Sequence, residues 1–149
     1  MRLLSLSLLV LALLAVGTAH ATPSALEKQI AAAVDRRADA ALELLAETVN
    51  VQGATENLPG VRAVGEIYAR EFRALGFETR WVDVPAEMRR AGHLVATHRG
   101  QRDGPRLLLI GHLDTVLQGE PFRRDGNRAY GTGSSDMKGG NLVALEALR

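Results

Sequence analysis

The feature that most constrains the fold is an unbroken run of four large apolar residues at positions 107–110. Such a run is typical of a strand buried on both faces, as in an α/β protein with helices on either side of the sheet. A turn sequence at 102–105 precedes the run and Gly111 follows it. The sequence therefore predicts an α/β fold in which residues after Ile110 lie at the carboxyl end of a buried strand. Binding crevices of open α/β sheets lie at such ends.

Two helices are predicted before this strand. Ser24-Ala25-Leu26-Glu27 has the S-x-x-E form of a capping box, so a helix should begin there and run to about Asn50. Pro59-Gly60 suits the start of a second helix, and Gly76 suits its end. Apolar side chains recur at helical spacing in both segments: Leu26, Ile30, Ala33, Leu42, Leu45 and Val49 in the first, and Val61, Val64, Tyr68, Phe72 and Leu75 in the second.

Shorter elements are predicted around and after the apolar run. Residues 77–84 and 93–99 have the composition of strands, and Asp125-Gly126 between short extended segments indicates a hairpin. Residues 141–149 have helical spacing of leucines. We interpret Trp81 as a packing residue, and His93 and His98 as ordinary strand histidines, because their odd separation places them on opposite faces.

The first 21 residues have the three-part composition of a secretory signal peptide. Arg2 gives a positive start, residues 3–16 are apolar apart from two serines, and Ala19-His20-Ala21 is a small-x-small cleavage pattern. The alternative, a membrane anchor, needs about 20 apolar residues, and this core is shorter. We expect cleavage after Ala21, a mature chain of residues 22–149, no membrane attachment after cleavage, and a periplasmic or secreted location.

Composition excludes several classes of function. The chain has no cysteine, so it has neither a disulfide nor a thiolate site, and any metal must be held by His, Asp or Glu. Its formal net charge is +1, which provides no basic field for a nucleic-acid partner.

The first segment with chemical potential is Gly111-His112-Leu113-Asp114, directly after the predicted buried strand. In extended backbone, His112 and Asp114 project to the same side. A neutral imidazole can then bind a metal through one nitrogen while the carboxylate orients the ring. Taken alone, a histidine near a strand end is more often structural.

The second segment is the glycine-rich stretch 130–140, in which Asp136 precedes the final helix. One carboxylate can bridge two metal ions about 3.5–4 Å apart. A nucleotide loop is the competing interpretation. It fails because Asp136 stands where the dinucleotide pattern needs glycine, and because Lys138 precedes Gly139-Gly140 instead of following a glycine as the P-loop pattern requires.

Together the motifs Gly-His-x-Asp-Thr-Val and Gly-x-Gly-x-x-Asp-Met-Lys-Gly-Gly resemble those of the co-catalytic zinc family of glutamate carboxypeptidase, acetylornithine deacetylase and succinyl-diaminopimelate desuccinylase. Glu120-Pro121-Phe122 is most similar to the glutamate carboxypeptidase branch. The resemblance implies that residues 22–149 are the N-terminal part of a zinc-exopeptidase-like, three-layer α/β/α catalytic domain, truncated before its lid and dimerisation domain and its C-terminal half.

The resemblance also implies roles for single residues. His112 would bind one Zn²⁺, Asp136 would bridge two, Asp114 would be a catalytic-site residue that supports His112, and the Asp136-Met137 peptide bond would be cis. The implied reaction is hydrolysis of an amide or peptide bond, with a C-terminal amino acid such as glutamate released. An N-acyl amino acid substrate is the alternative within the family.

The family's general base, a Glu-Glu pair, and its remaining ligands would lie beyond Arg149. We therefore expect the 149-residue chain alone to be inactive, and the full-length parent to be a homodimer. The alternative of another class is an exported remnant or binding module without enzymatic activity.

Overall fold

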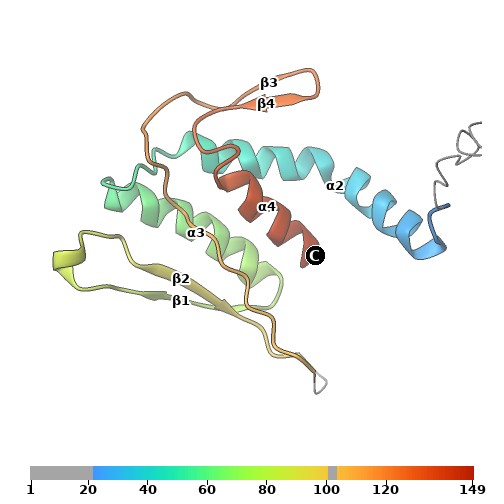
Figure 1. Cartoon of the computed structure of the whole chain (residues 1–149), viewed down its shortest axis with the longest axis horizontal. Helices are drawn as coiled ribbons and strands as arrows, with labels where there is room; N and C mark the ends of the chain where they lie inside the picture. The colour runs from blue at the N-terminus through green and yellow to red at the C-terminus, as the bar shows by residue number, and fades with distance from the viewer. Residues whose placement is uncertain (1–21, 101–103) are drawn as a thin grey trace, which may run out of the picture. The chain divides into compact units, whose positions relative to one another are not determined.

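The computed structural model describes residues 22–100 and 104–149. The predicted signal peptide and part of the predicted turn at 102–105 lie outside the described residues. The chain divides within its first described helix, after Asp35, into two compact units, and each is described by itself. Figure 1 labels the elements in chain order: α2 (Ala25–Asn50), α3 (Leu58–Ala74), β1 (Glu78–Val82), η1 (Ala86–Met88), β2 (His93–Thr97), β3 (Arg123–Asp125), β4 (Arg128–Tyr130) and α4 (Lys138–Ala147).

Helix α2 begins with the predicted capping box. The Ser24 backbone N–H donates to Glu27 Oε2 at 2.6 Å, and the Glu27 N–H donates to Ser24 Oγ at 3.2 Å. Two of the four free N–H groups of the helix start are thereby satisfied. The predicted apolar face is confirmed only in the second half of the helix. Leu45 and Val49 are buried there, whereas Leu26 and Ile30, in the unit that ends at Asp35, are exposed.

Helix α3 has the predicted boundaries, and each has a local cause. The Asn57 side chain accepts the Gly60 N–H at 3.2 Å, and Pro59 occupies the first turn, where its missing N–H costs nothing. Gly76 follows the helix with φ of 83°, a conformation that favours glycine. The apolar face predicted for this helix is buried or half-buried.

The strands form two separate antiparallel hairpins (Figure 1). In the first, β1 pairs with β2 from Glu78 opposite Thr97 to Val82 opposite His93. In the second, Asp125 pairs with Arg128, so the two-residue loop is Gly126-Asn127, with Gly126 at φ of 58°. The two predicted strands of the first hairpin are confirmed, although their pairing was not predicted. The second hairpin is confirmed, with its turn one residue later than the Asp-Gly pattern predicted.

The core of the second unit lies where α2, α3 and α4 pack together. Its buried members come from all three helices: Leu44, Leu45, Val49, Val64, Tyr68, Leu142 and Leu145. The hairpins contribute half-buried residues, among them Leu94, Phe122 and Ala129. Trp81 is held as a packing residue, as predicted, since its indole N–H donates to the Ala91 carbonyl at 2.9 Å. This combination of helices and small antiparallel sheets is that of a partial α/β fold.

The prediction of a buried strand at 107–110 is wrong for this structure. Leu107, Leu108, Leu109 and Ile110 are 61% to 88% exposed and have no strand assignment. A strand requires hydrogen-bonding neighbours, and within residues 22–100 and 104–149 the ladders are those of the two hairpins and one isolated parallel bridge, Ala54 with Thr115. The apolar pattern is present, but nothing in the described chain covers it.

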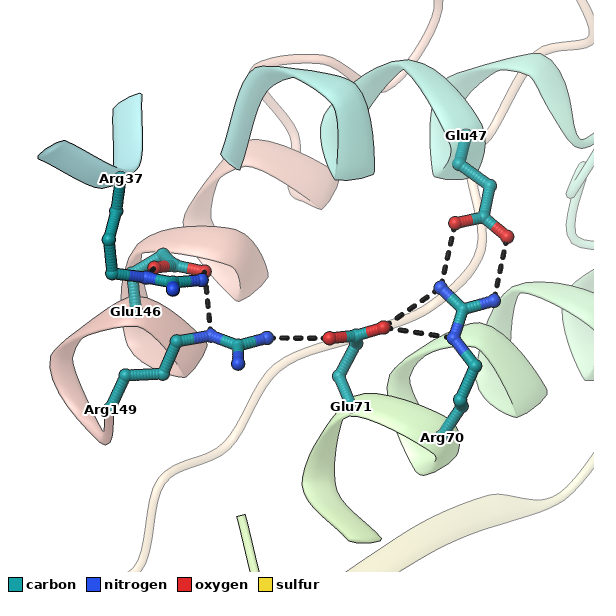
Figure 2. A network of polar contacts seen from close by, with 6 residues as sticks. All are labelled: Arg37, Glu47, Arg70, Glu71, Glu146 and Arg149. Carbon is teal, nitrogen blue, oxygen red and sulfur yellow. Dashed lines mark hydrogen bonds and ion pairs between the residues drawn. The ribbon is translucent and has the colours of Figure 1, made fainter. Parts of the chain in front are cut away.

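A chain of ion pairs links the three helices of the second unit (Figure 2). Glu146 on α4 accepts from Arg37 on α2 at 2.6 Å and from Arg149 at 2.9 Å. Arg149 also contacts Glu71 on α3 at 2.5 Å. From there the chain continues through Arg70 to Glu47 on α2, at 2.7 Å. Because Arg149 and its two partners are largely shielded from water, that part of the network contributes more than an exposed pair does.

Candidate metal centre

The segment that carries His112 is held by its backbone from two sides. The His112 N–H donates to Met137 Sδ at 3.3 Å, and its carbonyl accepts from Asn141 Nδ2 at 2.7 Å. Gly111 is needed here, because a Cβ at this position would collide with the Asn141 side-chain oxygen. Three residues after His112, Thr115 forms the parallel bridge with Ala54. The segment is therefore fixed although it is not a strand.

The imidazole of His112 lies between two carboxylates. Its Nε2 is 2.9 Å from Asp136 Oδ1, and its Nδ1 is 3.0 Å from the Asp114 carbonyl oxygen and 3.3 Å from Asp114 Oδ1. The structure thus brings together all three residues that the sequence singled out, from two segments 24 positions apart. Their roles in metal binding stay predictions.

Asp136 lies in a tight turn that leads into α4. Gly131 and Gly133 have φ of 140° and 79°, and the Gly133 carbonyl accepts the Lys138 N–H at 2.9 Å. The Asp136-Met137 peptide bond is cis, as predicted. The Asp136 side chain is 84% exposed, so its second oxygen is open to water or to an ion.

Lys138 anchors this turn to the helical core. Its side chain is buried, and its Nζ donates to the carbonyls of Thr48 at 2.7 Å and Val51 at 3.1 Å. The Lys138 carbonyl accepts the hydroxyl of Tyr68 at 2.8 Å. Burial raises the pKa of Tyr68 to about 12, so this hydroxyl keeps its proton. Burial lowers the pKa of Lys138.

Electrostatics at the site favour protonated His112 in the absence of a metal. Partial burial alone would lower the pKa of His112. Hydrogen bonds to Asp136 and to the Asp114 carbonyl, together with the two negative charges, raise it by more than burial lowers it, so the pKa of His112 is above its ordinary value. Two carboxylates beside one imidazole attract a positive charge to this point. A proton and a metal cation would compete for it.

The donor set fits a hard or borderline cation. One imidazole nitrogen and one carboxylate oxygen lie within 2.9 Å of each other, and the remaining ring nitrogen has an oxygen partner that can fix its tautomer. In residues 22–100 and 104–149, no group of three or more potential metal ligands occurs. His112 and Asp136 remain the two predicted metal ligands of the described chain, and their role as half of a two-metal site stays a prediction.

The other two histidines of the described chain lie in the first hairpin region. His93 pairs with Val82 at the start of β2, and His98 packs its ring against Phe77, with centroids 5.0 Å apart. These placements agree with the interpretation of both as ordinary histidines.

Several residues of the site were missed by sequence reasoning. Thr55 donates its hydroxyl to Asp114 Oδ2 at 2.5 Å, across 59 positions of sequence. Lys138, Met137 and Asn141 support the two segments through the contacts described above. Only Lys138 carried a signal in the sequence, since the chain has two lysines and this one lies in a glycine-rich stretch whose other charged residue is Asp136.

Comparison with known proteins identifies the class to which this fold and site belong. Residues 108–149, which include His112, Asp114 and Asp136, match the family described as Peptidase family M20/M25/M40. The segment that carries the candidate site is therefore assigned to this family.

Individual relatives agree with this assignment. The chain is 36% identical over 115 residues to carboxypeptidase G2 of Pseudomonas sp. (strain RS-16), across 74% of this chain and 27% of that protein. It is 34% identical over 106 residues to succinyl-diaminopimelate desuccinylase of Leptothrix cholodnii, across 65% of this chain and 27% of the relative. It is 33% identical over 115 residues to putative succinyl-diaminopimelate desuccinylase DapE of Mycobacterium tuberculosis, across 75% and 29%. The aligned part spans a little more than a quarter of each relative's length.

Proposed function

We propose that the chain supplies the first half of a two-zinc centre in a hydrolase of amide or peptide bonds. The observation that carries the proposal is the convergence of His112 Nε2 and Asp136 Oδ1 at 2.9 Å, from two motifs that the family match includes. In the proposed centre His112 would bind one Zn²⁺, Asp136 would bind both, and Asp114 would keep the imidazole in the required tautomer. Bound zinc would lower the pKa of a water molecule and polarise the substrate carbonyl.

The chain's own residues would orient the first ligands and keep the turn rigid. Asp114 accepts the Nδ1 proton of His112, which leaves Nε2 free as a ligand. Lys138 and Tyr68 fix the backbone that carries Asp136. The general base and the other ligands are assigned to a part of the protein beyond Arg149, and for this reason we propose that the 149-residue chain alone does not hydrolyse amides.

The proposed substrate is a peptide or related amide from which a C-terminal amino acid such as glutamate is released. A relative named carboxypeptidase G2 supports this choice. An N-acyl amino acid is the second candidate, and relatives named succinyl-diaminopimelate desuccinylase favour it. An exported remnant that binds without catalysis is the proposal of another class.

Hydrolysis assays separate these proposals. The full-length parent protein, loaded with Zn²⁺, should release amino acid from a C-terminal glutamate peptide or from a succinylated amino acid, and a chelator should stop the reaction. Release from the first substrate alone supports the carboxypeptidase, and release from the second alone supports the deacylase. No release from either, by a folded parent with zinc bound, would contradict both and favour the remnant.

Two further proposals concern the protein in the cell. Residues 1–21 are proposed to be removed during export to the periplasm or medium, and N-terminal sequencing of the exported product should begin at Thr22. The full-length parent is proposed to be a homodimer, which light scattering tests. In the described residues no helix has the length and apolar character needed to cross a membrane.

A further inference from the structure

The two oxygens of the Asp114 carboxylate have different partners. Oδ1 lies 3.3 Å from His112 Nδ1, and Oδ2 accepts the hydroxyl of Thr55 at 2.5 Å. A carboxylate is otherwise free to rotate over a broad range about its last side-chain torsion. With both oxygens engaged, it has one orientation, and that orientation is set by the position of Thr55.

Thr55 is itself held by backbone hydrogen bonds. Its N–H donates to the Thr115 carbonyl at 2.9 Å, and the Thr115 N–H donates to the Gly53 carbonyl at 2.9 Å. These are the bonds of the parallel bridge between Ala54 and Thr115, and Ala54 is buried. The segment after α2 is thus paired with the segment that carries Asp114, and the register of this pairing places the hydroxyl beside the carboxylate.

The hydroxyl has one proton and two acceptors within reach. Asp114 Oδ2 is at 2.5 Å and the Thr115 carbonyl oxygen is at 3.1 Å. A hydrogen bond from an O–H group to a carboxylate is short and about twice as strong as one between neutral groups, so the hydroxyl proton points to Asp114. The bond is also partly buried, which protects it from competition by water.

Two carboxylates compete for the proton of neutral His112. Asp136 faces Nε2 but is highly exposed, so water screens it. Asp114 faces Nδ1 with both its carbonyl and its oriented carboxylate oxygen. A fixed Asp114 therefore favours the Nδ1–H tautomer, in which Nε2 is free to bind a metal.

We propose that Thr55 is a positioning residue of the metal centre: its hydroxyl holds Asp114 in the orientation that keeps the proton of His112 on Nδ1 and presents Nε2 to the metal. The inference rests on the proposed function for the identity of the metal site. The contact between Thr55 and Asp114 itself needs no metal, so the two can be tested separately.

The test compares the full chain with Thr55→Val, which is nearly isosteric but lacks the hydroxyl, and with Thr55→Ser, which retains it. Thr97→Val, at the exposed end of β2, is the matched control. The first readout is the tautomer of His112, from the ¹⁵N chemical shifts of its ring nitrogens, measured without metal at a pH above the raised pKa of His112, where the ring is neutral. The second is Zn²⁺ affinity, measured by competition with a chromophoric chelator.

Thr55→Val should lower the Nδ1–H fraction and weaken zinc binding about tenfold to a hundredfold, the usual effect of losing a residue that supports a metal ligand. Thr55→Ser and Thr97→Val should behave like the wild type. In an Asp114→Asn background, Thr55→Val should cause no further change in tautomer or zinc affinity. A threonine with only a structural role would still weaken zinc binding in that background. If Thr55→Val does not fold, the comparison of Thr55→Ala with Thr55→Ser takes its place.

A Thr55→Val chain that keeps both its tautomer and its zinc affinity within twofold would overturn the inference. Failure of the proposed function gives a different result, because the wild type and His112→Ala would then bind Zn²⁺ equally well. Additive effects of Thr55→Val and Asp114→Asn would also overturn the inference, since they would mean that Thr55 acts independently of Asp114.

Discussion

Replacement of Lys138 by methionine tests whether its ammonium group holds the Asp136 turn against the helical core. Lys138 is 1% exposed, and its Nζ donates to Thr48 and Val51. Helix α2 ends at Asn50, so the Thr48 carbonyl is one of the last four of that helix and has no acceptor role within it. The ammonium group therefore caps α2, where a positive charge is also favourable.

The magnitude follows from two opposing contributions. A hydrogen bond from a charged group is worth about 1.5–3 kcal/mol, and a buried carbonyl left without a donor costs about 1–3 kcal/mol. In the opposite direction, Lys138→Met removes the free-energy cost of burying a charge, a cost that also lowers the pKa of Lys138. We expect Lys138→Met to reduce the free energy of unfolding by about 2 kcal/mol, because only one of the two carbonyls belongs to a fully buried residue.

Urea denaturation followed by circular dichroism measures this change. The second lysine of the chain, Lys28, is exposed on α2 and provides a matched control. Lys28→Met should change stability by no more than about 0.5 kcal/mol. A Lys138→Met chain as stable as the wild type would refute the reasoning, because it would mean that the two carbonyls need no ammonium group.

Three further predictions concern acid stability, the glycine turn and the exposed apolar run. A hydrogen bond from Arg37 lowers the pKa of Glu146, so the Glu146 carboxylate stabilises the fold above the ordinary glutamate pKa, and this stabilisation is lost as the pH falls through the lowered pKa. The urea midpoints of the wild type and of Glu146→Gln should therefore converge between pH 7 and pH 3. A constant difference between the two midpoints would contradict this. Gly133→Ala should lower the free energy of unfolding by about 1–3 kcal/mol in thermal unfolding, and by more than Gly126→Ala does. Both glycines have positive φ, but only at Gly133 would a Cβ collide with a threonine methyl group. Equal losses of stability in the two variants would mean that this collision has no effect. Ile110→Glu should lower self-association of the chain in sedimentation velocity, because residues 107–110 form an exposed apolar run, and unchanged association would show that the run does not mediate it.

Local patterns of sequence predicted the helices and hairpins well. The reciprocal bonds of Ser24 and Glu27 and the bond between Asn57 and Gly60 each join residues three positions apart, and the positive φ of Gly76 belongs to a single residue. Such interactions depend on residue type and spacing alone, so a single sequence contains them.

The final helix was predicted over residues 141–149, and the two glycines directly before that range are poor helix formers. In the structure it begins at Lys138. Gly139 has a packing role, since a Cβ there would collide with the Ser134 carbonyl oxygen, and Lys138 is anchored to α2. Tertiary contacts thus outweigh propensity at this boundary.

The apolar run at 107–110 failed for a different reason. Apolar composition indicates what a segment needs to bury, but a strand forms only where a neighbour provides hydrogen bonds, and the described chain provides none there. For the site, the motifs singled out His112, Asp114 and Asp136, which the structure brings together, and their roles at a metal stay predictions. Thr55 could not be predicted, because its contact with Asp114 depends on pairing between segments 59 positions apart.

The most direct test of the central claim is anomalous diffraction at the zinc absorption edge, from crystals of the chain grown with Zn²⁺. We expect a zinc peak bound by His112 Nε2 and an Asp136 oxygen at about 2.0–2.2 Å, with water in the remaining positions, and no such peak in His112→Ala and Asp136→Ala crystals. A zinc ion bound only at His93 or His98, or an unchanged peak in His112→Ala crystals, would show that His112 and Asp136 are not the metal ligands.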